Sequence, residues 1–270
     1  MKTSRRMSSR ITCGILVIAA LTVAVSAWAQ RNEYAYKKFG EPWKKCEKIT
    51  YRGASDQYYV MIGNTPVPIA RKDIEGLRIP KPSDFDKYAR EFRGGSPSPE
   101  ATRGMENIAF QYKMLVWDVQ AYLLVFPTYL KDNNTAGIMK VCDDYERVTS
   151  TVPDALQGFF WKALLENRQS ARLKKALTDA IENGSRPVAA TAHIVRGDLY
   201  VDEGKKTDAL IDGYFRVIIL FKDVRGVQAE ALFKAWQTLK SMSDPRADKF
   251  RQRLVDEFPG SLYSKQSRSG

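Results

Sequence analysis

The sequence has few of the residues that build metal centres and nucleophilic active sites. It contains one histidine, His193, and three cysteines, no two of which form a C-x-x-C pair. A zinc site, a Ser-His-Asp triad and a Cys-His pair all need histidine or cysteine close to other ligands or nucleophiles. We therefore expect no metal, no cofactor and no catalytic residues in this chain.

A concentrated block of one charge is also absent from the chain. The formal net charge is +12, but Lys and Arg are interspersed with Asp and Glu. This mixture argues against a nucleic-acid partner, because nucleic-acid surfaces gather basic residues on one face. A basic chain can still make weak contacts with anionic polymers of a cell envelope.

Long apolar runs are restricted to the amino-terminal end. Residues 1–29 consist of a basic head, an apolar run from Ile11 to Val25, and the small-residue ending Ala27-Trp28-Ala29. This order is typical of a secretory signal peptide and predicts cleavage after Ala29. The alternative is a retained inner-membrane anchor, although the run is shorter than the roughly 20 residues that span a bilayer. We expect a periplasmic or secreted protein.

Two cysteines, Cys46 and Cys142, follow the expected cleavage site. In an oxidising compartment an even number permits a disulfide, here between the start of the mature chain and a segment far along it. The alternative is two unpaired thiols. The sequence leaves both states open.

Residues 30–80 have the pattern of a small antiparallel β module. The text EKITYRGASDQYYVMIGNTPVPIARKDIEGLRIP places short β-branched and aromatic groups between turn residues. This spacing predicts a small sheet or an SH3-like barrel. Gly63-Asn64 is expected to form a hairpin turn, and Pro66 and Pro68 should confine the following strand to an edge. Residues 81–100, rich in proline, glycine and serine, are expected to form a linker.

Residues 101–265 have helical periodicity and an internal repeat. An alanine recurs just past a polar turn, with spacings of 35, 38 and 38 residues, at Ala136, Ala171, Ala209 and Ala247. A period in the thirties with two helices per unit predicts a helical solenoid, in which stacking buries the apolar face of each pair. The expected fold is therefore mainly α, with a small β module in front.

The unit from Thr191 to Phe221 resembles a tetratricopeptide repeat. Gly197 and Tyr200 stand where that motif has a first-helix glycine and aromatic residue. Gly204 and Ala209 stand at its inter-helix turn and its second-helix alanine. The ending DEFPGSLY is similar to the endings of exported bacterial tetratricopeptide proteins. With its export signal and β module, the chain looks like envelope proteins of Verrucomicrobia and Planctomycetes.

The same unit also departs from the motif. His193 replaces the motif's tryptophan and is expected to be a partly buried packing residue. Gly213 replaces a large apolar residue of the second helix.

The resemblance implies a non-catalytic scaffold that binds a peptide or partner helix of another envelope protein. The binding surface would be the concave face lined by the first helix of each pair. Carried over by register, the partner-binding positions are Leu156, Phe160, Thr191, Ile194, Asp198, Asp202, Leu232, Trp236 and Lys240. The alternative for the aromatic residues Phe160, Trp161 and Trp236 is simple packing of helix against helix.

Two other functions remain open from the sequence. An enzyme or enzyme subunit would require acids such as Glu166, Asp198 and Asp202 to gather in a cleft. A cell-wall or polysaccharide-binding protein would use the basic β module. The oligomeric state is not indicated by any pattern in the chain.

Overall fold

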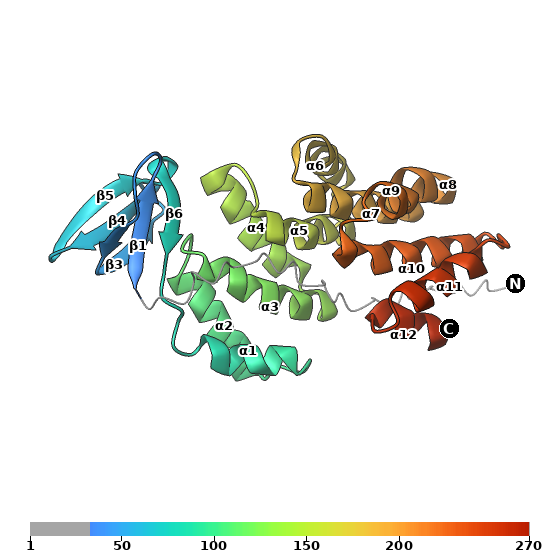
Figure 1. The fold of residues 1–270 in the computed structure, drawn as a ribbon, viewed down its shortest axis with the longest axis horizontal. Helices are drawn as coiled ribbons and strands as arrows, with labels where there is room; N and C mark the ends of the chain where they lie inside the picture. The colour runs from blue at the N-terminus through green and yellow to red at the C-terminus, as the bar shows by residue number, and fades with distance from the viewer. Residues whose placement is uncertain (1–32, 270) are drawn as a thin grey trace, which may run out of the picture.

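A computed structural model describes residues 33–269, which form a small antiparallel β module followed by a long array of helices (Figure 1). The mainly helical fold with a β module at its front is therefore confirmed. The expected signal peptide, residues 1–29, lies outside the described residues. Within the described part of the chain, no helix has the length and apolar character needed to cross a membrane.

The β module consists of two three-stranded antiparallel sheets. One sheet has the order β2-β1-β6 and the other has the order β3-β4-β5. The strands are β1 (Tyr34–Lys38), β2 (Lys44–Cys46), β3 (Lys48–Arg52), β4 (Gln57–Ile62), β5 (Thr65–Ala70) and β6 (Ile74–Arg78), with the short 3-10 helix η2 (Arg71–Asp73) before β6. Only Glu47 separates β2 from β3, so one nearly continuous stretch of chain contributes to both sheets. Side chains of both sheets form one apolar core around Tyr36, Ile49 and Val60.

The hairpin between β4 and β5 has the expected turn and edge. Gly63 and Asn64 both adopt positive φ, 53° and 65°, as a tight two-residue hairpin turn requires. β5 pairs only with β4, and Pro66 and Pro68 lie on this edge strand. Because proline has no amide hydrogen, these residues remove donors that could otherwise pair with a further strand.

The helical part begins earlier than the sequence indicates. Helix α1 (Phe85–Arg93) lies within residues 81–100, the segment expected to be a linker, and its buried Phe85 and Ala89 share an apolar cluster with Met105 and Ala121. The helices that follow are α2 (Pro99–Gln111), α3 (Trp117–Lys131), α4 (Thr135–Thr149), α5 (Asp154–Glu166), α6 (Ser170–Asn183), α7 (Arg186–Asp202), α8 (Lys206–Asp208), the π-helix η3 (Ala209–Tyr214), α9 (Phe215–Leu220), α10 (Arg225–Ser241), α11 (Ala247–Glu257) and α12 (Leu262–Ser269).

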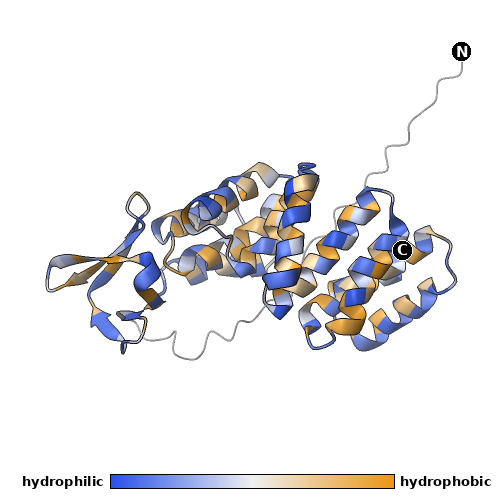
Figure 2. Ribbon diagram, turned by 90° about the horizontal axis from the view of Figure 1, so that it is seen from above, coloured by the Kyte–Doolittle hydropathy of each residue, from blue (hydrophilic) through white to orange (hydrophobic). Residues whose placement is uncertain are grey.

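From α3 onward the helices form antiparallel pairs. We call α3, α5, α7 and α10 the first helices and their partners α4, α6, the run α8-η3-α9, and α11 the second helices. Each first helix contacts its own second helix, and α3, α5 and α7 also contact the first helix of the next pair. Apolar residues follow the faces on which neighbouring helices meet (Figure 2). A single helix pair would leave part of its apolar surface in water. Burial of that surface against the neighbouring pairs supplies most of the stabilisation of the helices.

The turns that end the first helices share one backbone geometry. In each turn one residue adopts a φ between 55° and 76°, and the next amide donates to the carbonyl five residues before it at 2.7–3.0 Å. This is the hydrogen bond of a Schellman cap. The four residues at positive φ are Asn133, Arg168, Gly204 and Ser243. Gly204 thus ends α7 in the same way as the other three residues end their helices, so its segment is a turn between two helices.

A glycine pair brings α7 and its second helix unusually close. A β-carbon added at Gly213 would lie 2.6 Å from the Cα of Gly197, and one added at Gly197 would lie 2.5 Å from the ring of Tyr214. The absence of a side chain at Gly213, which departs from the tetratricopeptide pattern, is therefore explained by direct backbone contact. The π-helix η3 begins at Ala209 and contains this crossing.

Candidate functional site

A row of charged side chains crosses the first helices α5, α7 and α10. Lys162, Asp198 and Lys234 occupy one position each on these helices, at a constant separation of 36 residues. Glu230 lies one turn before Lys234 on α10. Their side chains are 14–20% exposed, so the row is largely screened from solvent but still reaches the surface.

The members of this charged row contact one another directly. Lys162 Nζ lies 3.3 Å from Glu230 Oε1, and Lys234 Nζ lies 3.5 Å from the same oxygen. Lys234 also forms an ion pair with Asp198. The Tyr214 hydroxyl donates to Asp198 Oδ1 at 2.9 Å. Opposite charges therefore alternate from α5 to α10.

Burial and the neighbouring charges shift the pKa values of the row in different directions. Burial would raise the pKa of Glu230, but Lys162 and Lys234 outweigh it and lower that pKa to about 2. Burial would lower the pKa of Lys234, but Asp198 and Glu230 raise it. Lys162 has a lowered pKa, because burial and the positive charge of Lys234 outweigh its acidic neighbours. Glu230 is thus held as a carboxylate between two amines.

The carboxyl-terminal helix adds a hydrogen bond to the row. The Tyr263 hydroxyl on α12 interacts with Glu230, and burial together with that carboxylate raises the pKa of Tyr263. The Tyr263 ring packs on Phe233 of α10, with ring centroids 5.4 Å apart. Helix α12 thus covers the end of the array and fixes Glu230 from a third side.

The chemistry available to the charged row is limited by its surroundings. The two recesses of about 230 and 290 Å³ that lie elsewhere on the described structure have linings without a member of the row. Residues 33–269 contain no group of three His, Cys, Asp or Glu side chains arranged to hold a metal ion. Each charge in the row already has an opposite charge as its partner. The arrangement can fix the first helices in register and present a polar surface between them.

The structure corrects five of the nine partner-binding positions taken from the sequence. Five of these side chains are only 0–5% exposed and pack mainly inside the protein, namely Leu156, Phe160, Ile194, Leu232 and Trp236. Of these, Trp236 still reaches the wall of a surface recess. Phe160, Trp161 and Trp236 pack helix against helix, the alternative already noted for them.

On α5 and α10 the predicted positions differ in helical register from the charged row. The predicted inward positions are Phe160 and Trp236, whereas the members of the charged row on these helices, Lys162 and Lys234, lie two residues away in each case. Two residues correspond to a rotation of about 200° around an α-helix, which exchanges one face for the other. On α7 the register holds for Asp198, which belongs to the charged row.

The remaining predicted positions lie at or near the surface. Thr191 is partly buried, and its methyl group would meet a β-carbon at Gly158 of α5 at 3.2 Å. Asp202 is exposed at the end of α7, and Lys240 is exposed beside the Trp236 ring, with Nζ 5.2 Å from the ring centroid. Glu166, an acid considered for catalysis, is exposed at the end of α5.

Lys162, Glu230 and Lys234 were missed by the sequence analysis. The signal that could have revealed them is a lysine or acid at a constant 36-residue interval within otherwise apolar helices. A charge inside such a helix is costly unless it has a partner, so its recurrence points to a partner on the neighbouring repeat.

The remaining noted residues have structural roles. Cys46 is a partly buried free thiol against the core of the β module, and Cys142 is a fully buried free thiol in the helical core. The disulfide between them is therefore not present in this structure. His193 is 5% exposed, and its Nδ1 lies 2.9 Å from the Asp212 carbonyl oxygen. Since a carbonyl only accepts, Nδ1 carries the hydrogen.

Comparison of the chain with the models of known protein families, with curated proteins and with solved structures finds no match.

Proposed function

We propose that this chain is a non-catalytic interaction scaffold of the bacterial cell envelope. In this proposal the helical part is a tetratricopeptide-like solenoid that binds a peptide or partner helix of another envelope protein. The partner lies along the first-helix face, the surface formed by α5, α7 and α10.

The recurring contacts and turns support the solenoid. Successive first helices contact one another, and each second helix also contacts the first helix of the following pair. Extensive contacts between two second helices do not occur in the described part of the chain. First helices that meet while second helices diverge produce curvature, with the first helices on the inner side. The repeated helix-ending turns at Asn133, Arg168, Gly204 and Ser243 give each pair the same reversal.

The charged row is the observation that carries the assignment of the binding face. Lys162 on α5 and Glu230 on α10 meet although α7 lies between their helices in the series. Side chains can bridge in this way only where the three helices converge, which is the inner side of a curved array. The row therefore forms a polar floor, and exposed residues one turn further along the same helices, such as Asp202 and Gln237, border it.

The strand order supports an SH3-like barrel for the β module. The first strand β1 pairs with the last strand β6, and the β2-β3 stretch runs from one three-stranded sheet into the other. A 3-10 helix precedes the last strand. In the proposal this module is a small barrel packed against the front of the solenoid, where the Trp117 indole donates to the Ile79 carbonyl at 3.0 Å.

Affinity capture with surface variants tests the proposed function. The mature protein is immobilised and exposed to an envelope extract, in parallel with the variants Asp202→Arg and Gln237→Arg on the first-helix face and Lys140→Glu on the second helix α4. All three positions are exposed, so the variants should keep the fold. A protein retained by the wild type and by Lys140→Glu, but lost from both arginine variants, supports the proposal. Equal retention by all of them contradicts it.

A further inference from the structure

A recess in the helical part, beside the loop that leads into α3, holds a carboxylate with a free oxygen. The recess has a volume of about 290 Å³. Its lining consists of Asp118 and Tyr145, the apolar side chains of Met114, Val116, Val119 and Pro153, and two threonines at its margin, Thr149 and Thr151. Asp118 is 1% exposed and lies in the first turn of α3. It is not part of the charged row.

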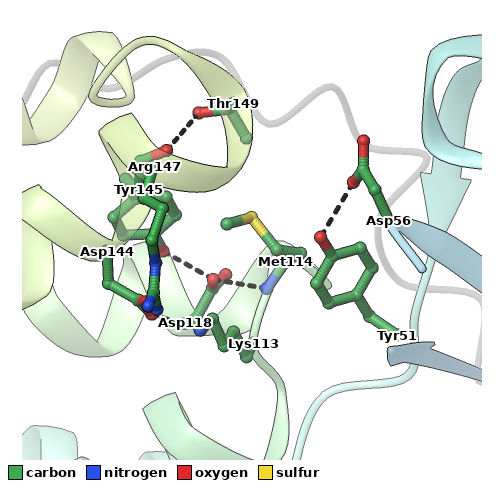
Figure 3. Close-up of polar contacts among 9 residues, drawn as sticks. All are labelled: Tyr51, Asp56, Lys113, Met114, Asp118, Asp144, Tyr145, Arg147 and Thr149. Carbon is green, nitrogen blue, oxygen red and sulfur yellow. Dashed lines mark hydrogen bonds and ion pairs between the residues drawn. The ribbon is translucent and has the colours of Figure 1, made fainter. Parts of the chain in front are cut away.

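One oxygen of Asp118 is saturated and the other is not. Oδ2 accepts from the Tyr145 hydroxyl at 2.5 Å and from the Met114 amide at 2.6 Å (Figure 3). Oδ1 is buried and has no hydrogen-bond partner of good geometry among the described residues. Burial raises the pKa of Asp118, and the nearby backbone amides of Val119 and Asp118 offset only part of that effect. Lys113, the nearest cation in sequence, pairs with Asp144 instead, as Figure 3 shows. Among the described residues no cation forms an ion pair with Asp118. A buried carboxylate without a counter-charge is costly, so this arrangement needs an explanation.

The loop that precedes α3 has a strained backbone, and this conformation positions the groups around Asp118. Met114 and Val116 adopt positive φ, 58° and 76°, which is unfavourable for a β-branched residue such as valine. The β module fixes the loop, because the Tyr58 hydroxyl donates to the Met114 carbonyl at 3.0 Å. The resulting conformation directs the Met114 amide at Oδ2 and leaves Val116 49% exposed at the recess. Strain of this kind persists where the surrounding structure maintains a site.

The walls and the base of the recess define the chemistry of a ligand. Met114, Val116, Val119 and Pro153 suit an aliphatic chain, and the single free oxygen of Asp118 suits one donor that carries a positive charge. We propose that this recess binds a primary alkylammonium group, either the side chain of a lysine or a free aliphatic amine. The thioether of Met114, a flexible side chain, moves aside to admit it. This inference is independent of the proposed function, since it concerns a different surface.

The proposal distinguishes ammonium from guanidinium. An arginine prefers to donate to both oxygens of a carboxylate in a planar fork. Oδ2 of Asp118 is already occupied by Tyr145 and Met114, so only one oxygen is available. An ammonium group is a compact charge that can use a single oxygen, and it is therefore the better match.

Titrations followed by protein NMR test the proposal on the mature chain. The probes are n-butylamine, Nα-acetyl-lysine methylamide, the corresponding norleucine compound, which lacks the ammonium group, and the arginine compound. We expect both amines to shift the amide signals of Met114, Val119 and Tyr145. The norleucine and arginine compounds should bind at least tenfold more weakly than the lysine compound. Tighter binding of the lysine compound than of butylamine identifies a polypeptide lysine as the ligand, and the reverse order identifies a free amine.

Two variants separate binding from folding. Asp118→Asn keeps an oxygen for Tyr145 and Met114 but removes the charge, and we expect at least tenfold weaker binding of both amines. Val116→Phe fills the recess from its exposed side with Asp118 intact, so it provides the same test if Asp118→Asn fails to fold. The proposal is overturned if the norleucine compound binds as well as the lysine compound. It is also overturned if the folded variant Asp118→Asn or Val116→Phe binds amines as tightly as the wild type, or if neither amine shifts the amide signals of the wild type. The last result would mean that only water meets Oδ1.

Discussion

Lys162 Nζ and Glu230 Oε1 lie 3.3 Å apart although 68 residues separate them in the chain. This contact joins α5 to α10 across α7, and Lys234 and Asp198 extend it into a chain of alternating charges. The charged row therefore fixes the positions of three helices relative to one another.

Removal of the Glu230 carboxylate should destabilise the protein more than the loss of an exposed ion pair does. Glu230→Gln leaves Lys162 without its partner and Lys234 with only Asp198, in a region where water is largely excluded. Breaking a buried pair from one side typically costs about 3–5 kcal/mol, so we expect a loss of about 3 kcal/mol in the free energy of unfolding. Urea denaturation at pH 7 measures it. Glu257→Gln, which breaks the exposed pair with Arg253, is the control and should change stability far less. Similar losses for both variants would contradict the account.

The same carboxylate should make stability depend on acid pH. The pKa of Glu230 is about 2 in the folded protein, against an ordinary value of 4.5. Its contribution is therefore fully present above pH 4.5 and is lost as the pH falls from 4.5 towards 2. The difference in unfolding free energy between wild type and Glu230→Gln should accordingly be largest near pH 6 and narrower at pH 3. A difference that widens as the pH falls would show that the folded pKa is not lowered.

The glycine contact between α7 and η3 should tolerate no side chain. In Gly213→Ala the new methyl group would lie 2.6 Å from the Cα of Gly197, and backbone cannot yield as a flexible side chain does. Overpacking typically costs about 1–3 kcal/mol, and we expect about 2 kcal/mol here, measured by thermal or urea unfolding. Gly260→Ala meets nothing within 4 Å and serves as the matched control. Equal stability of the two variants would refute the close approach.

Both cysteines should be recovered as free thiols. Cys46 is partly buried and Cys142 is fully buried, and burial raises the pKa of the Cys46 thiol to about 11. We expect slow alkylation of Cys46 in the folded protein and alkylation of Cys142 only after denaturation. Mass spectrometry of unreduced protein from the envelope measures this. Recovery of a peptide pair linked through Cys46 and Cys142 would contradict the structure.

The sequence predicts the parts of the fold that local chemistry controls. Gly63-Asn64 requires a tight turn, and Pro66 and Pro68 require an edge strand, so the β4-β5 hairpin could be placed in advance. The start of the helical part is predicted too late, because the short amphipathic segment FDKYAREF stands between Pro- and Gly-rich clusters and is assigned to a linker. Packing with α2 and α3 stabilises this segment as helix α1.

The charged row was harder to predict than the helices that carry it. An error of two residues in register exchanges Phe160 for Lys162 and Trp236 for Lys234, and apolar residues at neighbouring positions make either choice plausible. The repeated turn was also partly concealed, because Arg168 and Ser243 adopt a positive φ that only Gly204 and Asn133 indicate by residue type. The ion pairs between distant helices determine which helix face carries the charges. In the sequence, these pairs are visible only as the 36-residue spacing of Lys162, Asp198 and Lys234.

Site-specific photo-crosslinking in the envelope tests the central claim most directly. A benzoylphenylalanine is placed at Asp202 or Gln237 on the first-helix face, or at Lys140 or Lys249 on the second helices α4 and α11, all of which are exposed. Binding along the first-helix face predicts a crosslink to the same envelope protein from Asp202 and Gln237 and none from Lys140 and Lys249. Crosslinks to that protein only from Lys140 and Lys249 would place the binding surface on the opposite side and contradict the account.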